Sequence, residues 1–291
     1  MTLARVSVVR TSATPDDPLA FVGAPPDPAP RVDAVYICVV FTWHLAEAER
    51  LAVLWSRVAP HVVIGGPATG MRGEDFVPGL FVKQGRVITS RGCPNRCWFC
   101  SVWRREGAVV RELPIRDGHD VLDDNLLACS EDHIRAVFAM LKRQGEWVWR
   151  KSKKGGRWAW KRQRAKFTGG LEAARLKEWH ADLVVDLKPE TLFFALDTKD
   201  DWEPLVAASR LLIARGMHWK GHRIRAYVLC GYKGDTLDMA EARMRAVAGL
   251  RVFPMAMLWR GKDGERDKDW IKFAGHWANP IIAGALMREA R

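Results

Sequence analysis

Three cysteines that stand close together are the residues of this chain best suited to chemistry. Cys93, Cys97 and Cys100 follow the spacing CxxxCxxC. Three thiolates so closely spaced can hold one inorganic centre. Iron-sulfur clusters are commonly held by four cysteines, so a cubane bound through only three keeps one iron open to a small-molecule ligand. The spacing therefore predicts a cluster with an open iron, at which a reaction can take place.

Two other interpretations of the cysteines stay open. Together with a distant histidine they could hold structural zinc, although tight zinc sites usually pair two CxxC-like units and the sequence has no second unit. Alternatively, the three thiols are simply buried. Three chance thiols at this spacing, followed by a repeating pattern of strands and helices, would be unusual, so we favour the cluster.

The cysteine segment resembles the signature of the radical S-adenosylmethionine (radical SAM) superfamily, including the aromatic residue before the last cysteine, Phe99. In that superfamily the open iron of a 4Fe-4S cluster chelates the amino and carboxylate groups of SAM. An electron then passes to the sulfonium, which releases methionine and a 5'-deoxyadenosyl radical that abstracts hydrogen. The resemblance implies that Cys93, Cys97 and Cys100 bind the cluster and that Phe99 lies beside the cofactors. It also implies a flavodoxin-like or ferredoxin-like electron donor.

The composition is that of a globular protein. A chain of 291 residues with 48% hydrophobic residues can bury a sizeable core in one large domain or two smaller ones. The first residues lack the apolar core of a secretory signal, and no stretch approaches the roughly 18 apolar residues of a membrane span. Six cysteines, three of them clustered, do not suggest a disulfide framework, and a cluster requires a reducing compartment. We therefore expect a cytoplasmic protein that does not associate with a membrane.

The chain divides into four predicted parts. Six prolines in the first part predict an extended arm over 1–31, in which 14–31 has no regular structure. A small α/β unit over 32–84 follows, in which apolar runs and an amphipathic pattern predict strand, helix and strand. Strands and helices then alternate over 85–260, and 261–291 is predicted to be a helical tail.

Six apolar segments within 85–260 predict strands, at 87–89, 121–122, 166–168, 191–196, 223–229 and 252–258. Because a helix carries the chain back before each new strand, the strands are expected to be parallel. The predicted fold class is α/β, a six-stranded partial (β/α)6 barrel preceded by the small α/β unit. The radical SAM core has this architecture, and the resemblance covers about residues 85–260.

The small unit also weakly resembles the cobalamin-binding domain that precedes many radical SAM barrels, because Gly65, Gly66 and Pro67 follow its second strand. Such domains usually present a histidine to cobalt in a DxHxxG motif, which this sequence lacks. We therefore expect the unit to be structural and predict no cobalamin.

Ligands of α/β barrels lie at the carboxyl ends of the strands, where loops converge. This rule selects candidate cofactor-binding residues after four of the strands: Asp123, Asp124, Asn125, Thr168, Gly169, Glu172, Arg175, Asp197 and Gly231. By resemblance, the polar groups after the second strand bind the amino group of SAM, although the superfamily often has Gly-Gly-Glu there. The turn that begins at Gly231 resembles the strand-five turn that packs near the adenine.

Several of these candidates have ordinary alternatives. Asp123 could cap the next turn. Glu172 and Arg175 are one helical turn apart and could pair with each other, or Arg175 could meet the SAM carboxylate. Asp197, at a strand end next to apolar neighbours, is a candidate for the ribose hydroxyls.

A basic segment at 145–166 carries nine basic residues and one acid, so it accounts for eight of the twelve net positive charges. Its tryptophans predict a hairpin in which Trp147 pairs with Trp160 and Trp149 with Trp158. The hairpin is either a solvated structural element or an arm that binds nucleic acid through phosphate contacts and base stacking. The alternative function is accordingly a non-catalytic, metal-stabilised (Fe-S or zinc) protein that binds nucleic acid.

Overall fold

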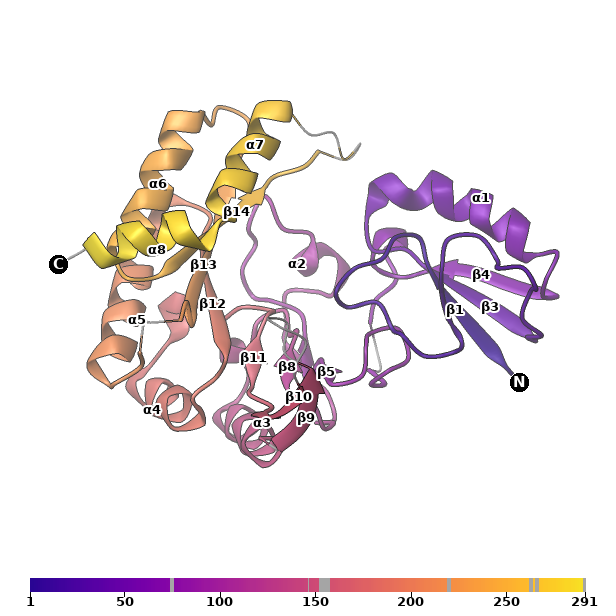
Figure 1. The fold of residues 1–291 in the computed structure, drawn as a ribbon, viewed down its shortest axis with the longest axis horizontal. Helices are drawn as coiled ribbons and strands as arrows, with labels where there is room; N and C mark the ends of the chain where they lie inside the picture. The colour runs from indigo at the N-terminus through magenta and orange to yellow at the C-terminus, as the bar shows by residue number, and fades with distance from the viewer. Residues whose placement is uncertain are drawn as a thin grey trace.

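The computed structural model describes residues 1–73, 76–145, 147–151, 158–218, 221–261, 264 and 267–289. It contains an N-terminal α/β unit and a larger α/β part, which Figure 1 shows side by side. Each part has its own cluster of buried apolar side chains. The two parts are therefore folded around separate cores.

The N-terminal unit is a four-stranded parallel sheet in the order β2-β1-β3-β4. Its strands are β1 (Leu3–Ser7), β2 (Ala20–Val22), β3 (Ala34–Cys38) and β4 (His61–Gly65). The helix α1 (Leu45–Trp55) and the short 3-10 turns η1 (Thr42–His44) and η2 (Pro67–Thr69) complete it. Trp55 of α1 is fully buried among the apolar side chains of the sheet. The predicted strand, helix and strand of this unit are confirmed.

The prediction of an extended arm over 1–31 is wrong, because β1 and β2 belong to the same sheet as β3. Ala4 and Val6 of β1 are completely buried. All six prolines lie between Thr14 and Arg31, so they leave β1 free to pair. β2 contains no proline and is an edge strand with one neighbour, where few ladder hydrogen bonds are needed.

The larger part is a six-stranded parallel sheet in the order β14-β13-β12-β11-β8-β5, which is the order of the chain read from the far edge. All six predicted strands form: β5 (Arg86–Val87), β8 (Asp120–Val121), β11 (Lys166–Phe167), β12 (Thr191–Leu196), β13 (Ile224–Cys230) and β14 (Phe253–Leu258). The predicted parallel α/β class is confirmed, because helices return the chain between successive strands.

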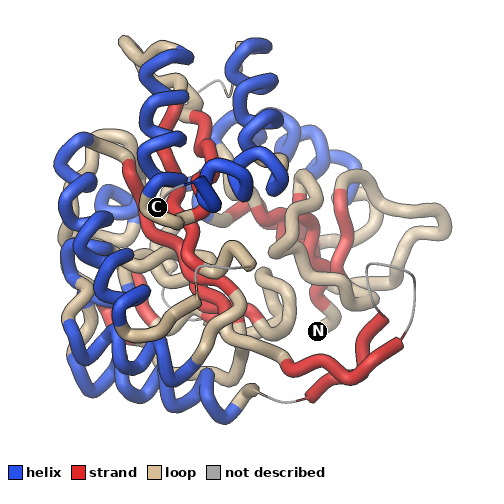
Figure 2. Tube along the Cα trace, turned by 60° about the vertical axis from the view of Figure 1, so that its left-hand side comes forward, coloured by secondary structure: helices blue, strands red, loops and turns tan. Residues whose placement is uncertain are grey.

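Helices lie along the outer side of these strands (Figure 2). They are α3 (Glu131–Arg143), α4 (Glu178–Leu187), α5 (Trp202–Ala214) and α6 (Leu237–Gly249), with the 3-10 turns η3 (Leu126–Ala128), η4 (Ala173–Arg175) and η5 (Lys199–Asp201). Their buried faces close the core of this part. For example, Ile134, Val184 and Leu212 are each at most 1% exposed.

The predicted helical tail forms α7 (Lys268–Trp277) and α8 (Pro280–Glu289). It belongs to the core of the larger part, because Trp277 is fully buried and its indole N–H donates to Glu241 at 2.7 Å. In the described part of the chain, no helix is long and apolar enough to cross a membrane.

The basic segment forms the predicted antiparallel hairpin of β9 (Trp147–Lys151) and β10 (Trp158–Arg162). Its register differs from the prediction by two residues. Trp149 lies opposite Trp160, whereas Trp147 faces Arg162 and Trp158 faces Lys151. The two predicted tryptophan pairs are therefore wrong, and one other pair forms.

Candidate functional site

The three cysteines lie in the connection between β5 and β8, which also holds the antiparallel pair β6 (Ser90–Arg91) and β7 (Arg111–Glu112) and the short helix α2 (Val102–Arg105). Gly92 adopts a φ of +92°, and a Cβ there would lie 2.4 Å from the carbonyl oxygen of Val109. A glycine is needed where the chain enters the cysteine loop. At the other end of the loop, the indole of Trp103 donates to the carbonyl of Cys97 at 3.1 Å.

All three cysteines are free thiols and partly buried. Burial, followed by the nearby thiols of Cys100 and Cys93, raises the pKa of Cys97 to about 11. Burial also raises the pKa of Cys100. Thiolates at these positions repel one another, so a multivalent cationic centre would stabilise all three at once. The donor set therefore suits a cluster.

In the described ranges, no group of three or more His, Cys, Asp and Glu side chains converges as the ligands of one metal ion do.

Asp123 fastens the end of β8 to the start of the cysteine loop. Its carboxylate accepts the main-chain N–H and the hydroxyl of Thr89, both at 2.6 Å, and the hydroxyl of Ser90 at 2.7 Å. Asp123 is only 2% exposed, and burial raises its pKa against the effect of these hydrogen bonds. The contacts favour a structural role for Asp123 and not the predicted contact with a cofactor.

Asp124 holds the main chain where it enters the cysteine loop. It accepts the N–H of Gly92, the residue before Cys93, at 2.9 Å and lies 3.7 Å from the guanidinium of Arg91. Burial raises the pKa of Asp124, while Arg91 and the Gly92 N–H act in the opposite direction. Asp124 thus sets the position of the first cysteine through the main chain.

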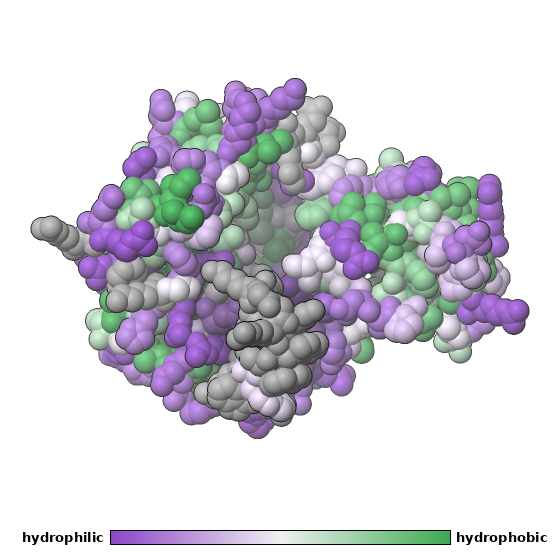
Figure 3. Space-filling model, viewed as in Figure 1, coloured by the Kyte–Doolittle hydropathy of each residue, from purple (hydrophilic) through white to green (hydrophobic). Residues whose placement is uncertain are grey.

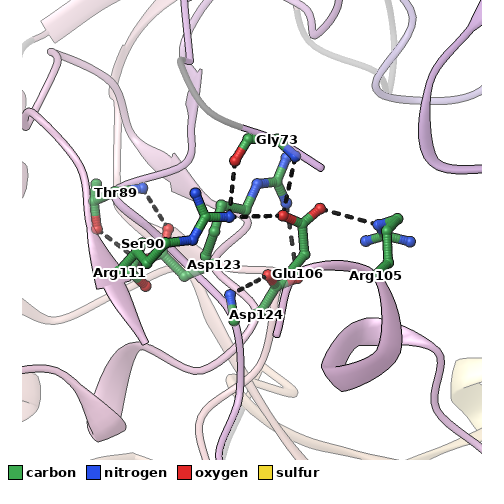
Figure 4. A network of polar contacts seen from close by, with 10 residues as sticks. Gly73, Thr89, Ser90, Arg105, Glu106, Arg111, Asp123 and Asp124 are labelled. Carbon is green, nitrogen blue, oxygen red and sulfur yellow. Dashed lines mark hydrogen bonds and ion pairs between the residues drawn. The ribbon is translucent and has the colours of Figure 1, made fainter. Parts of the chain in front are cut away.

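A buried glutamate that the sequence analysis missed completes this support (Figure 4). Glu106 is 2% exposed and pairs with Arg105 and Arg111, both at 3.0 Å. It also accepts the N–H of Gly73, and Arg111 donates to the carbonyl of Gly73 at 2.9 Å. This network joins the segment that leaves the N-terminal unit to the chain that follows the cysteines. A glutamate next to an arginine is too common in sequences to signal such a role.

Asn125 brings three of the predicted site residues together beside the cysteines. Its side-chain N–H2 lies 3.4 Å from the sulfur of Cys93 and 2.6 Å from Glu172. Glu172 in turn pairs with Arg175 at 2.6 Å, as one of the alternatives predicted. The Asn125 side-chain oxygen is buried and has no hydrogen-bond partner. A buried acceptor without a partner is costly, so this oxygen is suited to a donor on a ligand.

Asp197 presents a second unpartnered oxygen at the end of β12. Its Oδ1 is buried without a hydrogen bond. Burial, followed by the neighbouring charge of Asp201, raises the pKa of Asp197 to about 7. Asp197 also contributes to the raised pKa values of Cys97 and Cys100, which places it within electrostatic reach of the cysteine loop. Its position fits the predicted contact with a ligand hydroxyl.

Gly169 and Thr168 follow β11. A Cβ on Gly169 would lie 2.5 Å from the carbonyl oxygen of Asp123. This glycine therefore lets the ends of β8 and β11 pack closely, which is a structural role. Thr168 precedes it and is half-buried.

The turn after β13 contacts the cysteine loop through aromatic rings. Tyr232 packs edge-on against Trp98 at 5.7 Å between centroids, and Trp98 packs against Phe99 at 5.4 Å. Gly231 has a φ of +75°, and a Cβ there would lie 3.2 Å from the Trp270 ring of α7. The structure thus brings the predicted residues Phe99 and Gly231 to one place. Trp98 was missed, because only the fold brings it against Tyr232.

Comparisons with known proteins identify a similar fold. No protein-family model matches the chain, and no curated protein matches its sequence. Among solved structures, the chain is similar to TsrM from Kitasatospora setae, a radical S-adenosylmethionine methyltransferase with cobalamin and a 4Fe-4S cluster bound. The TM-score is 0.57 at 12% sequence identity, over 88% of this chain and 74% of that chain. The two proteins therefore share a fold.

Proposed function

We propose that this chain is a radical SAM enzyme in which Cys93, Cys97 and Cys100 hold a 4Fe-4S cluster beside a bound SAM molecule. The observation that carries the proposal is the position of Asn125. It joins Cys93 to Glu172 and keeps one buried oxygen without a partner. A ligand beside the first cysteine can supply the missing donor. The shared fold with a radical SAM methyltransferase supports the same assignment.

The residues around the loop fit the chemical groups of SAM. The Asn125 oxygen and the carboxylate of Glu172 are acceptors for its ammonium group, and Arg175 is a donor to its carboxylate. The unpartnered oxygen of Asp197 suits a ribose hydroxyl, and the turn at Gly231 suits the adenine. When bound, the cluster and SAM supply a 5'-deoxyadenosyl radical after one-electron reduction. The protein's part is to hold the donors and acceptors in place and to close the site with aromatic rings.

The architecture proposed for residues 85–260 is a partial barrel. The six parallel strands follow one another in chain order, and helices cover their outer side (Figure 2). The boundary near residue 85 is supported by contacts of 79–83 with the N-terminal unit, where Arg5 donates to the carbonyls of Gly79 and Leu80. We further propose a cytoplasmic location and a flavodoxin-like or ferredoxin-like reductant, because the cluster needs reducing conditions.

Cobalamin is not part of this proposal. TsrM was solved with cobalamin bound. The present chain lacks the DxHxxG motif that usually presents a histidine to cobalt. His44 lies instead among the rings of Phe41 and Trp43.

The substrate class that we propose is nucleic acid, bound through the basic hairpin of β9 and β10. The segment 145–166 carries most of the net positive charge, and Trp160 on β10 is 62% exposed. Basic side chains can bind phosphates, and an exposed indole can stack on a base. The same features fit the alternative function, a metal-stabilised protein that binds nucleic acid without catalysis.

Metal analysis distinguishes the two functions. Anaerobic reconstitution is expected to give a brown protein with about four irons per chain. Cys93→Ala, Cys97→Ala and Cys100→Ala are each expected to lose this iron, whereas Cys38→Ala, a matched thiol outside the loop, keeps it. Stoichiometric zinc without iron uptake would contradict the enzyme and favour the alternative.

A further inference from the structure

A cavity of about 330 Å³ lies where the N-terminal unit meets the larger part. In Figure 3 the surface is hollowed on the side of the larger part that faces the N-terminal unit. From the N-terminal unit, Val8, Val40 and Phe41 line the cavity at the carboxyl ends of β1 and β3. From the other side it is lined by Ile88, which follows β5. The volume falls in the range of small-molecule sites, and a mainly apolar lining with few polar groups is typical of them.

Among the described residues that line this cavity, the charged side chains at its polar end carry a net positive charge. Arg72 and Arg91 line it together with Glu106. Glu106 is already neutralised, because Arg105 and Arg111 both pair with it at 3.0 Å.

The two cavity arginines remain available to a ligand. Arg91 is part-exposed, and its ion pair with Asp124 is long at 3.7 Å. Arg72 is exposed and pairs with no carboxylate in the described ranges. An apolar cavity that ends in arginines suits an organic anion.

We propose that this cavity binds a small organic anion, with an aromatic or aliphatic body among the apolar side chains and a carboxylate, sulfonate or phosphate group at Arg91 and Arg72. The cavity is separate from the proposed SAM site, and Asp124 contacts residues of both regions. Arg91 contacts Asp124, which in turn holds the N–H of Gly92 before the first cysteine. An anion that binds Arg91 would therefore compete with Asp124, the residue that accepts the Gly92 N–H of the cysteine loop.

The test compares two fluorescent probes that differ in a single anionic group. These are 8-anilinonaphthalene-1-sulfonate and its uncharged parent N-phenyl-1-naphthylamine, titrated into the full-length chain. We expect the sulfonate to bind at one site per chain and at least about tenfold more tightly than the parent, because a charge-assisted hydrogen bond contributes that much. Equal affinities of the two probes would overturn the proposal.

Variants locate the site and provide folding controls. Arg91→Gln and Arg72→Gln are each expected to weaken the binding of the sulfonate by about fivefold or more. The affinity for the uncharged parent should not change. Arg57→Gln, an exposed arginine of the same unit outside the cavity lining, is expected to change neither. Unchanged binding of the uncharged parent shows that the cavity of a variant is intact. If Arg91→Gln and Arg72→Gln also bind the sulfonate as tightly as the unsubstituted chain, the proposal is contradicted.

A second pair of variants fills space instead of removing charge. Val40→Trp is expected to abolish binding of both probes, because Val40 lines the cavity and is 50% exposed, so its replacement does not disturb the core. Val53→Trp on the outer side of α1 is the matched control and is expected to have no effect. Binding that survives Val40→Trp would place the probe elsewhere. Displacement of the sulfonate by micromolar cyanocobalamin would make this a corrinoid site and would also overturn the proposal.

Discussion

The side-chain amide of Asn125 lies 3.4 Å from the sulfur of Cys93. This contact joins the end of β8 to the first cysteine of the loop, although the two residues are 32 positions apart in the chain. The same amide donates to Glu172 at 2.6 Å, while the oxygen of Asn125 has no partner. Asn125 is therefore the residue that links the cysteine loop to the proposed binding site for SAM.

Replacing Asn125 is expected to weaken SAM binding without loss of the cluster. Asn125→Ala removes the unpartnered acceptor and the contact with Glu172, but no proposed cluster ligand. A hydrogen bond to a charged group is worth roughly 1.5–3 kcal/mol, so equilibrium dialysis of reconstituted protein should show about 10- to 100-fold weaker SAM binding at unchanged iron content. Asn279→Ala, after α7, is the control. Unchanged affinity for SAM in Asn125→Ala would remove this residue from the site.

Replacing Asp123 is expected to destabilise the fold. Asp123→Ala removes the carboxylate that accepts from three donors on Thr89 and Ser90, and both residues are completely buried. The Thr89 hydroxyl keeps one further contact, with the ring of His133 at 3.3 Å. Each lost partner costs about 1–3 kcal/mol, so we expect the free energy of unfolding to fall by roughly 3–5 kcal/mol in urea denaturation. Asp200→Ala, an exposed aspartate, should change it by less than about 0.5 kcal/mol. If Asp123→Ala lowers the free energy of unfolding by less than about 1 kcal/mol, these hydrogen bonds do not stabilise the loop.

The raised pKa of Asp197 predicts how stability changes with pH. Because the pKa rises from 3.8 to about 7 on folding, the folded state favours the protonated carboxyl. The ionised form therefore destabilises the folded chain progressively as the pH rises from about 4 to about 7. Asp197→Asn, which cannot ionise, should be more stable than the unsubstituted chain by about 2–4 kcal/mol at pH 8, since each tenfold change in an acid dissociation constant corresponds to about 1.4 kcal/mol.

This difference should shrink as the pH falls and reach zero well below pH 4, where Asp197 is protonated in both states. Denaturation of the cluster-free chain at several pH values measures it. Asp200→Asn should follow the unsubstituted chain throughout. A pH-independent difference for Asp197→Asn would show that the carboxyl is not held protonated by burial.

Deleting the basic hairpin is expected to separate substrate binding from SAM cleavage. A chain without residues 146–164 should still release 5'-deoxyadenosine but bind RNA and DNA more weakly. The affinity of the full chain for nucleic acid should fall steeply with salt, because phosphate contacts release counterions. If the full chain shows no salt-sensitive binding to single-stranded or structured nucleic acid, the hairpin is a structural element or contacts a protein.

The strands of the larger sheet could be predicted because local pattern determines them. Each is a short apolar run bounded by turn residues, and the predicted bounds of Thr191–Leu196 agree with the structure at both ends. β1 was missed because the dense prolines nearby suggested that the whole N-terminal segment was an extended arm. The register of the hairpin was wrong by two residues. Such a shift keeps every side chain on the same face, so the spacing of the tryptophans does not distinguish the two registers.

The candidate site was predictable only in part, for a similar reason. The rule that ligands lie at strand ends selected Asn125, Glu172 and Asp197, which the structure places near the cysteines. It also selected Asp123 and Gly169, whose contacts are structural, because a strand end supplies both ligand-binding and packing residues. Glu106 and Trp98 were missed, because their roles depend on contacts that sequence spacing does not reveal.

The most direct test of the central claim is the release of 5'-deoxyadenosine. Protein reconstituted with iron and sulfide under anaerobic conditions is reduced with dithionite in the presence of SAM, and the products are separated by liquid chromatography. We expect 5'-deoxyadenosine and methionine from the full chain and from Cys38→Ala, and none from Cys93→Ala, Cys97→Ala or Cys100→Ala. An iron-loaded protein that leaves SAM intact, or cleavage that persists after loss of any one of these three cysteines, would contradict the account.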